Sequence, residues 1–85
     1  MFFVYLIRCD DGSLYTGIST DYKTRFSQHA QGKGARYTRM RKPVRIVHIE
    51  EYRTKSEALK RERQVKGWRR EKKETLIRRT QSMPG

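Results

Sequence analysis

The chain opens with a run of apolar and aromatic residues, Phe2 to Ile7, that is hydrophobic on both alternating faces. A run of this kind predicts a strand that is covered on both sides. Turn residues follow at Asp10-Asp11-Gly12, and a second short run extends from Leu14 to Ile18. The pattern therefore predicts an antiparallel hairpin whose first strand lies inside a sheet.

The length of the hairpin loop decides which side chains share a face. With a three-residue loop and Gly12 in the left-handed conformation, Tyr5 lies opposite Gly17 and on the same face as Tyr15. Glycine weakens a strand, but at position 17 its missing side chain gives the Tyr5 ring room. A two-residue loop would instead place the two tyrosines on opposite faces.

The next segment carries apolar side chains at four-residue spacing. Tyr22, Phe26 and Ala30 recur as the buried stripe of an amphipathic helix. Asp21, or Thr20 beside it, can cap the start of this helix. We therefore expect the helix to pack against the sheet through this stripe.

Arg25 and His29 form a neighbouring row on the same helix, also four residues apart. Residues at this spacing lie one above the other on a helix surface. At the edge of the stripe they can face the hairpin. The pattern therefore brings a cation and an imidazole towards Tyr15.

The segment 32–42 has no helical or strand period and is interpreted as a loop. It is either a solvated connection or an arm that contacts phosphates and stacks an aromatic ring on a base. The charge of the whole chain favours the second interpretation. The residues predicted to bind nucleic acid are Lys33, Arg36, Tyr37, Arg39, Arg41 and Lys42.

The second half of the chain predicts one strand and two helices. Val44 to Ile49 is the third strand, in which His48 is expected to be an ordinary strand residue. A capping box at 54–57, in which Glu57 can reach the Thr54 amide, opens a helix that ends near Gly67. Leu76 and Ile77 can anchor a last helix, and Trp68 is interpreted as a core anchor rather than a stacking platform.

One carboxylate of the helix that begins at residue 54 points inward. Glu62 follows Ala58 by four residues and precedes Val65 by three, and both of these are apolar. Lys60 and Arg61, in contrast, are expected to be solvated. An isolated carboxylate among apolar neighbours is costly unless a cation joins it. Glu62 is therefore a candidate metal ligand.

The composition indicates the class of partner. The 85 residues are expected to form one domain, 1–79, with a flexible tail at 80–85. Lys and Arg number 21 against nine Asp and Glu, a net charge of +12, and such a balance indicates nucleic acid as partner. No segment has the pattern of a membrane helix or a secretory signal. With a single cysteine, Cys9, these features predict a cytoplasmic protein without membrane contact.

In order, Val4-Tyr5-Leu6, Tyr15-Thr16-Gly17, Arg25, His29 and Glu62 resemble the signature of the GIY-YIG nuclease superfamily. The resemblance covers nearly the whole chain. It is greatest to the small, single-domain UPF0213 (YhbQ-like) group, which has a loop of the GKGARYTR type and a helix end of the RERQVKGW type. Each element alone is unspecific, whereas the ordered set is specific.

The resemblance implies an α+β fold with a small three-stranded antiparallel sheet flanked by helices, in the order β-β-α-β-α-α. It also implies hydrolysis of phosphodiester bonds with one Mg²⁺ or Mn²⁺ ion. The residues that match the family's site are Tyr5, Tyr15, Arg25 and His29 as catalytic groups, Glu62 as metal ligand, and Gly17 as a structural residue. The base is Tyr15 or His29, with Tyr15 preferred.

Two functions follow from this interpretation. The first is a metal-dependent endonuclease, selective for the structure of its substrate as in repair or recombination, that acts on DNA in preference to RNA. The alternative is a nucleic-acid-binding module, for DNA or for RNA on the ribosome, that keeps the fold without turnover. Because the domain is small, we expect its basic loop and last helix, or a protein partner, to supply specificity.

Overall fold

The computed structural model describes residues 1–32 and 41–82, with side chains as far as residue 80. The strands β1 (Phe2–Cys9), β2 (Leu14–Ser19) and β3 (Pro43–Tyr52) form one antiparallel sheet in the order β2-β1-β3. The helices in the described residues are α1 (Tyr22–Ala30), α3 (Lys55–Lys66) and α4 (Arg70–Ser82). The fold is therefore α+β with β1 at the centre, as the sequence predicts.

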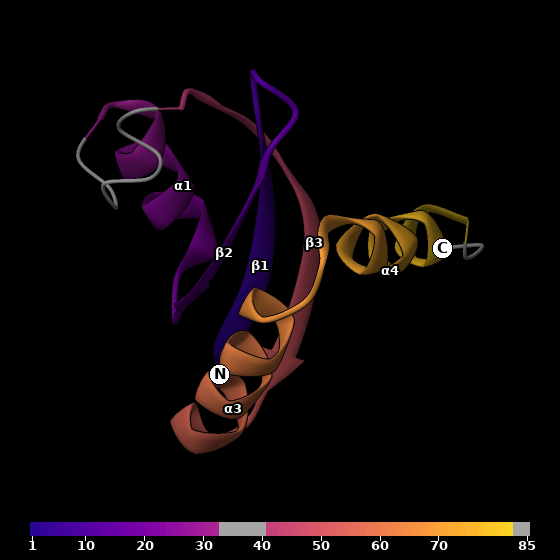
Figure 1. Ribbon diagram of the computed structural model, residues 1–85. Coiled ribbons are helices and arrows are strands. Elements are labelled where there is room, and N and C mark those ends of the chain that lie inside the picture. The colour runs from indigo at the N-terminus through magenta and orange to yellow at the C-terminus, as the bar shows by residue number, and fades with distance from the viewer. Residues whose placement is uncertain (33–40, 83–85) are drawn as a thin grey trace.

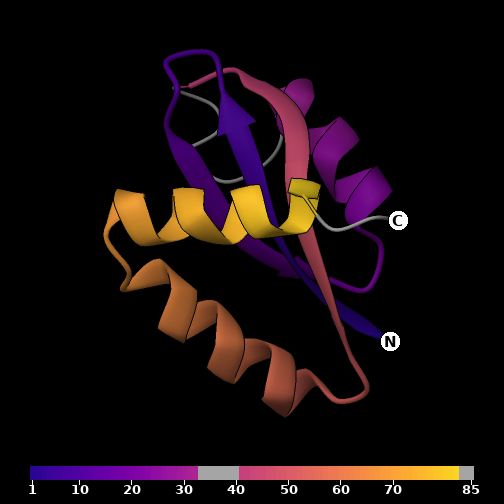
Figure 2. The same cartoon turned by 90° about the vertical axis from the view of Figure 1, so that its right-hand side faces the viewer.

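Helices cover both faces of the sheet. α1 packs on one face, and α4 crosses the other face with α3 beside it (Figures 1 and 2). Successive side chains of β1 point to opposite faces, so Tyr5 and Leu6 belong to different parts of the core. Tyr5 packs with residues from α1, whereas Leu6 packs with Val65 of α3 and Ile77 of α4.

The hairpin between β1 and β2 has the three-residue loop that the sequence predicts. The Cys9 amide donates to the Ser13 carbonyl at 2.9 Å, and Gly12 has a φ of +83°. This turn places Tyr5 opposite Gly17. The register of the sheet therefore follows from the left-handed conformation that glycine adopts without strain.

Side chains cap the starts of α1 and α3. Asp21 accepts a hydrogen bond from the Thr24 amide at 3.1 Å, and Thr54 accepts one from the Glu57 amide at 3.2 Å. The Glu57 carboxylate accepts from the Thr54 hydroxyl at 2.9 Å rather than from the backbone amide that the capping box suggests. α3 ends at Gly67 as expected.

Two details differ from the sequence pattern. Of the nine residues of α1, all of which the structure describes, only His29 is buried, whereas Ala30 is exposed. The inward row is thus Tyr22, Phe26 and His29, because four-residue steps drift off a helix face that has a period of 3.6. α4 also continues to Ser82, so residues 80–82 of the expected tail extend a helix.

Candidate active site

The hairpin places Tyr5, Gly17 and Tyr15 on the face of the sheet that α1 covers. The Tyr5 ring lies directly over Gly17. A Cβ atom at position 17 would lie 2.5 Å from both Cζ and the hydroxyl oxygen of Tyr5. Such a distance is too short for any side chain, so Gly17 supplies the space that the Tyr5 ring occupies.

His29 of α1 completes this cluster. Its Nε2 atom lies 3.4 Å from the Tyr5 hydroxyl, and its ring centroid is 5.1 Å from that of Tyr15. Tyr5 and His29 are closed to solvent, with 1% and 0% of their surface exposed, whereas Tyr15 is half-buried. Of these three residues, Tyr15 is therefore the one whose side chain can meet a ligand.

Charges from two helices act on the tyrosine hydroxyls. Burial raises the pKa of Tyr15, the charge of Glu62 raises it further, and the charge of Arg25 lowers it. The pKa of Tyr5 is also raised, by burial first and then by Tyr15, and Arg25 again opposes the shift. The hydroxyls therefore lie within electrostatic range of both a guanidinium and a carboxylate.

The pKa of His29 is shifted by the same surroundings. Burial, and then the positive charge of Arg25, lower the pKa of the imidazole below its ordinary value of 6.5. His29 is therefore neutral at neutral pH and can accept as well as donate a hydrogen bond.

Arg25 and Glu62 reach the cluster from different layers of the fold. Arg25 is half-buried on α1, and its Nη1 donates to Gln28 at 2.9 Å. Glu62 belongs to α3, the helix that packs against Leu6, and only 12% of its side chain is exposed. The Glu62 carboxylate lies 3.5 Å from Lys66 Nζ rather than beside an arginine. The inward orientation expected for Glu62 is confirmed.

The predicted nucleic-acid-binding loop is described only at its end. Lys33, Arg36, Tyr37 and Arg39 lie outside the described residues. Arg41 Nε contacts the Asp11 carboxylate at 3.0 Å, and the Lys42 carbonyl accepts from the Asp10 amide at 2.8 Å. These two bonds attach the described end of the loop to the β1–β2 turn.

The residues around the tyrosine cluster can be compared with the ligands that metal ions require. Within residues 1–32 and 41–80, no three His, Cys, Asp or Glu side chains are grouped so that they could hold a metal ion. Mg²⁺ keeps several waters and commonly binds proteins through one or two carboxylates together with a substrate phosphate. A single inward carboxylate, Glu62, fits that mode of binding.

A second polar cluster, centred on Glu50 of β3, was not predicted. Arg61 Nε and Nη2 donate to the Glu50 carboxylate at 2.8 and 3.0 Å, and the Tyr52 hydroxyl donates at 2.7 Å. His48 Nε2 lies 2.8 Å from the same carboxylate, and its Nδ1 lies 2.6 Å from the Thr80 hydroxyl. Burial alone would raise the pKa of Glu50, but the hydrogen bonds together lower it.

Two expectations are corrected by this cluster. His48 is a buried, doubly hydrogen-bonded residue rather than an ordinary strand residue, and Arg61 is held by a carboxylate rather than solvated. The alternation of His48, Glu50 and Tyr52 at two-residue spacing was the available signal, because such residues share one face of a strand.

In the part of the chain that the structure describes, every helix is too short or too polar to cross a bilayer.

Comparison with known proteins gives consistent matches. A family model described as the GIY-YIG catalytic domain matches residues 1–75. A UPF0213 protein of Staphylococcus aureus strain Mu3 is 53% identical over 76 residues, which cover 89% of this chain and 93% of that protein.

Two solved structures are also similar. The solution NMR structure of the UPF0213 protein BH0048 from Bacillus halodurans has 47% identity and a TM-score of 0.58, covering 91% of this chain and 83% of that one. The solution NMR structure of the protein EF2693 from E. faecalis has 34% identity and a TM-score of 0.63, covering 98% and 88%.

Proposed function

Because this chain belongs to the GIY-YIG family, we propose that it is a divalent-metal-dependent endonuclease that hydrolyses phosphodiester bonds, in DNA in preference to RNA. The substrate is a branched or partly unpaired structure of the kind met in repair and recombination. The observation that carries the proposal is the half-buried Tyr15 ring, whose centroid is 5.1 Å from that of His29 and whose hydroxyl feels the opposed charges of Arg25 and Glu62.

Arg25 binds the scissile phosphate in this proposal. Its guanidinium is half-buried beside the tyrosines, where a positive charge is worth more than in open water. A phosphate gains negative charge on its oxygens as the attacking group approaches, and a positioned arginine stabilises that charge. Loss of Arg25 therefore slows cleavage more than it weakens binding.

Tyr15 positions and deprotonates the attacking water. An ordinary phenol, with a pKa of about 10, is ionised in only about one molecule per thousand at neutral pH. Burial and the charge of Glu62 raise the pKa of Tyr15 further, and Arg25 only partly opposes the shift, so a phenolate would need a bound metal ion as well as Arg25 to stabilise it. Neutral His29 receives or relays the proton, and its contact with the Tyr5 hydroxyl fixes its ring.

Glu62 would hold a single Mg²⁺ or Mn²⁺ ion together with water and substrate phosphate. Such an ion, when bound, neutralises charge on the leaving oxygen. The carboxylate is largely buried, so it is restricted in orientation before an ion arrives. Lys66, which now contacts Glu62 at 3.5 Å, must give way.

One observation favours the non-catalytic alternative, a nucleic-acid-binding module. The contact with Lys66 already satisfies Glu62 without a metal ion, as in a protein that does not use one. The net charge of +12 supports binding in either case. Only the nuclease requires a divalent ion for an effect on the substrate.

A cleavage assay separates the two functions. Flaps, gaps, single strands and duplexes are incubated with Mg²⁺ or Mn²⁺, or with a chelator. We expect metal-dependent cleavage that falls by about 100-fold or more in Glu62→Gln and Arg25→Ala. Binding of the substrate, measured in parallel, changes much less.

Two variants serve as matched controls. Glu51→Gln and Arg53→Ala remove the same charges from exposed positions of β3 and of the turn that follows it. Both are expected to cleave at the wild-type rate. Binding without cleavage of any substrate by the wild type would establish the alternative.

A further inference from the structure

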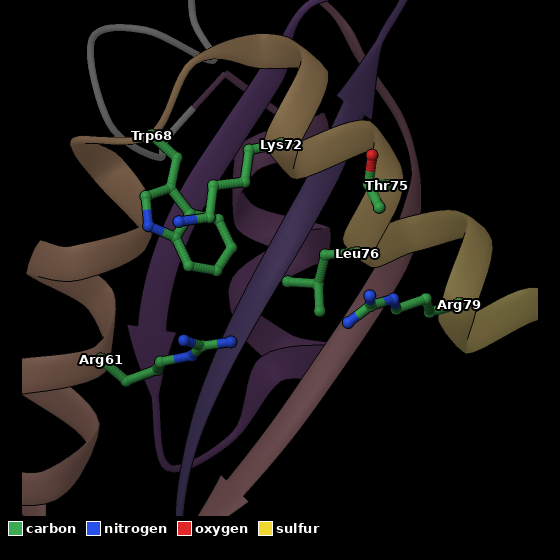
Figure 3. Close-up of a pocket in the computed structure, with 6 residues that line it drawn as sticks. All are labelled: Arg61, Trp68, Lys72, Thr75, Leu76 and Arg79. Carbon is green, nitrogen blue, oxygen red and sulfur yellow. The ribbon is translucent and has the colours of Figure 1, made fainter.

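A hollow lies between α3 and α4, on the face of the sheet opposite the tyrosine cluster. It encloses about 210 Å³ and is lined by Arg61, Trp68, Lys72, Thr75, Leu76 and Arg79. Figure 3 shows the side chains of Arg61 and Arg79 pointing towards each other across it, with Leu76 between them and the Trp68 ring above Arg61. The active-site residues proposed above do not line it.

The lining combines positive charge with an apolar wall. Three of the six residues are cations and none is acidic. Lys72 Nζ lies 4.3 Å and Arg61 Cζ 4.8 Å from the Trp68 ring centroid. Both cations therefore lie within cation–π range of the Trp68 ring.

One wall of the hollow is rigid because Glu50 holds Arg61. The two-pronged contact, at 2.8 and 3.0 Å, fixes the plane of the guanidinium, and Arg61 Nη1 donates to Gln64 at 3.0 Å. His48 and Tyr52 hold the carboxylate in turn. A wall that is ordered before a ligand arrives loses little entropy on binding.

The three cations of the lining differ in exposure, because Arg61 is half-buried whereas Lys72 and Arg79 are exposed. Glu50 offsets the charge of Arg61. The main contribution of Arg61 is therefore its contact with the Trp68 ring and not the attraction of an anion. Lys72 and Arg79, about two turns apart on α4, bring the other two positive charges of the lining. An anion entering the hollow would meet these two side chains first.

We propose that this hollow binds one unpaired nucleotide of a nucleic-acid strand. The phosphate contacts Lys72 and Arg79, and the sugar and base pack against Trp68 and Leu76. A polyanion with apolar rings is the ligand whose chemistry matches both parts of the lining. A hollow of about 210 Å³ suits a single nucleotide better than a base pair, which favours an unpaired nucleotide.

This inference rests on the proposed function to the extent that the substrate is nucleic acid, and it narrows the class of substrate. The hollow and Tyr15 lie on opposite faces of the sheet. A strand held at Trp68 therefore contacts the protein away from the bond that is cut. The preferred substrate has a single-stranded arm that passes around the domain.

Trp68 is the single tryptophan of the chain, so its fluorescence reports on this hollow. A short single-stranded oligonucleotide is titrated into the full chain, with a chelator present to prevent cleavage. We expect a saturable change in Trp68 emission. The double variant Lys72→Ala/Arg79→Ala should weaken the apparent affinity about tenfold, as removal of contacts to one phosphate predicts.

The control is Arg53→Ala/Lys55→Ala, which lowers the net charge equally at exposed positions outside the hollow. Its affinity should change less than about twofold. Circular dichroism of both double variants verifies that they are folded. An equal loss of affinity in the two double variants would show that only the net charge matters, and it would overturn the proposal.

Two competitors test the identity of the ligand. Blunt duplex of the same length should displace the oligonucleotide weakly, and tripolyphosphate should displace it only at much higher phosphate concentration. Equal displacement by either one would overturn the assignment of an unpaired nucleotide. An unchanged Trp68 signal during binding detected by another method would do the same.

The outcome of these binding experiments does not depend on whether the protein cleaves its substrate. If the oligonucleotide binds at Trp68 but no substrate is cut, the proposed nuclease function fails and the binding site remains. If substrates are cut but the variant in the hollow binds them like the wild type, the site fails and the nuclease remains.

Discussion

The Tyr5 hydroxyl lies within 2.5 Å of the point where a Cβ atom of residue 17 would stand. The two residues are direct cross-strand partners, and the Tyr5 ring fits in its place only because residue 17 has no side chain. Gly17→Ala should therefore displace the Tyr5 ring from His29. We expect a loss of about 1–3 kcal/mol in the free energy of unfolding, the usual cost of overpacking, together with most of the cleavage activity.

Denaturant unfolding and the cleavage assay measure these two effects. Gly67→Ala is the matched control, because a Cβ at position 67 meets the Gln64 carbonyl at an ordinary 3.6 Å. It should leave both quantities nearly unchanged. A stable and active Gly17→Ala variant would show that the Tyr5 ring can move without consequence.

Removal of each tyrosine hydroxyl should have different effects. Tyr5 is buried against His29, so Tyr5→Phe should cost about 1 kcal/mol of stability, the net value of a typical hydrogen bond. Tyr15 is half-buried at the site, so the main effect of Tyr15→Phe should be to lower kcat by about 100-fold or more. Unfolding curves and single-turnover cleavage measure both. Full activity in Tyr15→Phe would exclude Tyr15 as the base.

Stability should depend on pH through His29. Its pKa is lower in the folded state than the ordinary value of 6.5, by burial first and by Arg25 second. The unfolded chain therefore takes up a proton first, and the stability that neutral His29 contributes is lost as pH falls below 6.5. In unfolding experiments across this range, His29→Gln should show a flatter profile. An identical profile in the variant would contradict the shift.

Lys66 should compete with the metal ion for Glu62. Their contact at 3.5 Å joins the largely buried Glu62 carboxylate to a lysine whose side chain is 51% accessible, so solvent screens the pair from one side. Such pairs are worth at most about 1 kcal/mol, so Lys66→Met should raise the affinity for Mn²⁺ by up to about fivefold. Titration of free Mn²⁺ by electron paramagnetic resonance measures the affinity. Lys60→Met on the same helix is the control, and a weaker affinity in Lys66→Met would count against Glu62 as ligand.

Glu50 should support the fold and the hollow between α3 and α4. Glu50→Gln leaves Arg61 without its two-pronged partner, and we expect a loss of about 2 kcal/mol in the free energy of unfolding. Because the pKa of Glu50 is lowered in the folded state, its contribution is present above 4.5 and lost as pH falls below that value. Thermal unfolding at neutral and acidic pH should therefore show the largest difference between wild type and variant at neutral pH.

Local patterns were sufficient to predict the strands, the helix caps and the hairpin register. The register follows from Gly12, because one glycine in the left-handed conformation determines the length of the loop and so the partner of Tyr5. The apolar run at Phe2 to Ile7 likewise identified β1 as the central strand. In these cases the information lies within a few residues of the feature that it determines.

The rotation of α1 and the partner of Arg61 could not be obtained in the same way. The apolar residues at four-residue spacing point to Ala30, whereas His29 faces the core because the helix has a period of 3.6 and packs on the sheet through that row. Arg61 contacts Glu50, which lies 11 positions earlier in the sequence. Charged side chains are usually exposed to solvent, so the sequence offers no reason to pair these two. Contacts of this kind depend on how separate elements pack.

Adjacent residues of β1 serve opposite sides of the molecule. Tyr5 contributes to the tyrosine cluster and Leu6 supports the helices that enclose the hollow. Mutations that alter one surface can thus accumulate without altering the other, as long as the strand between them keeps its pairing. Under the two proposals above, a lineage that carries this domain can change which nucleic acids it prefers while it inherits the bond-breaking chemistry intact.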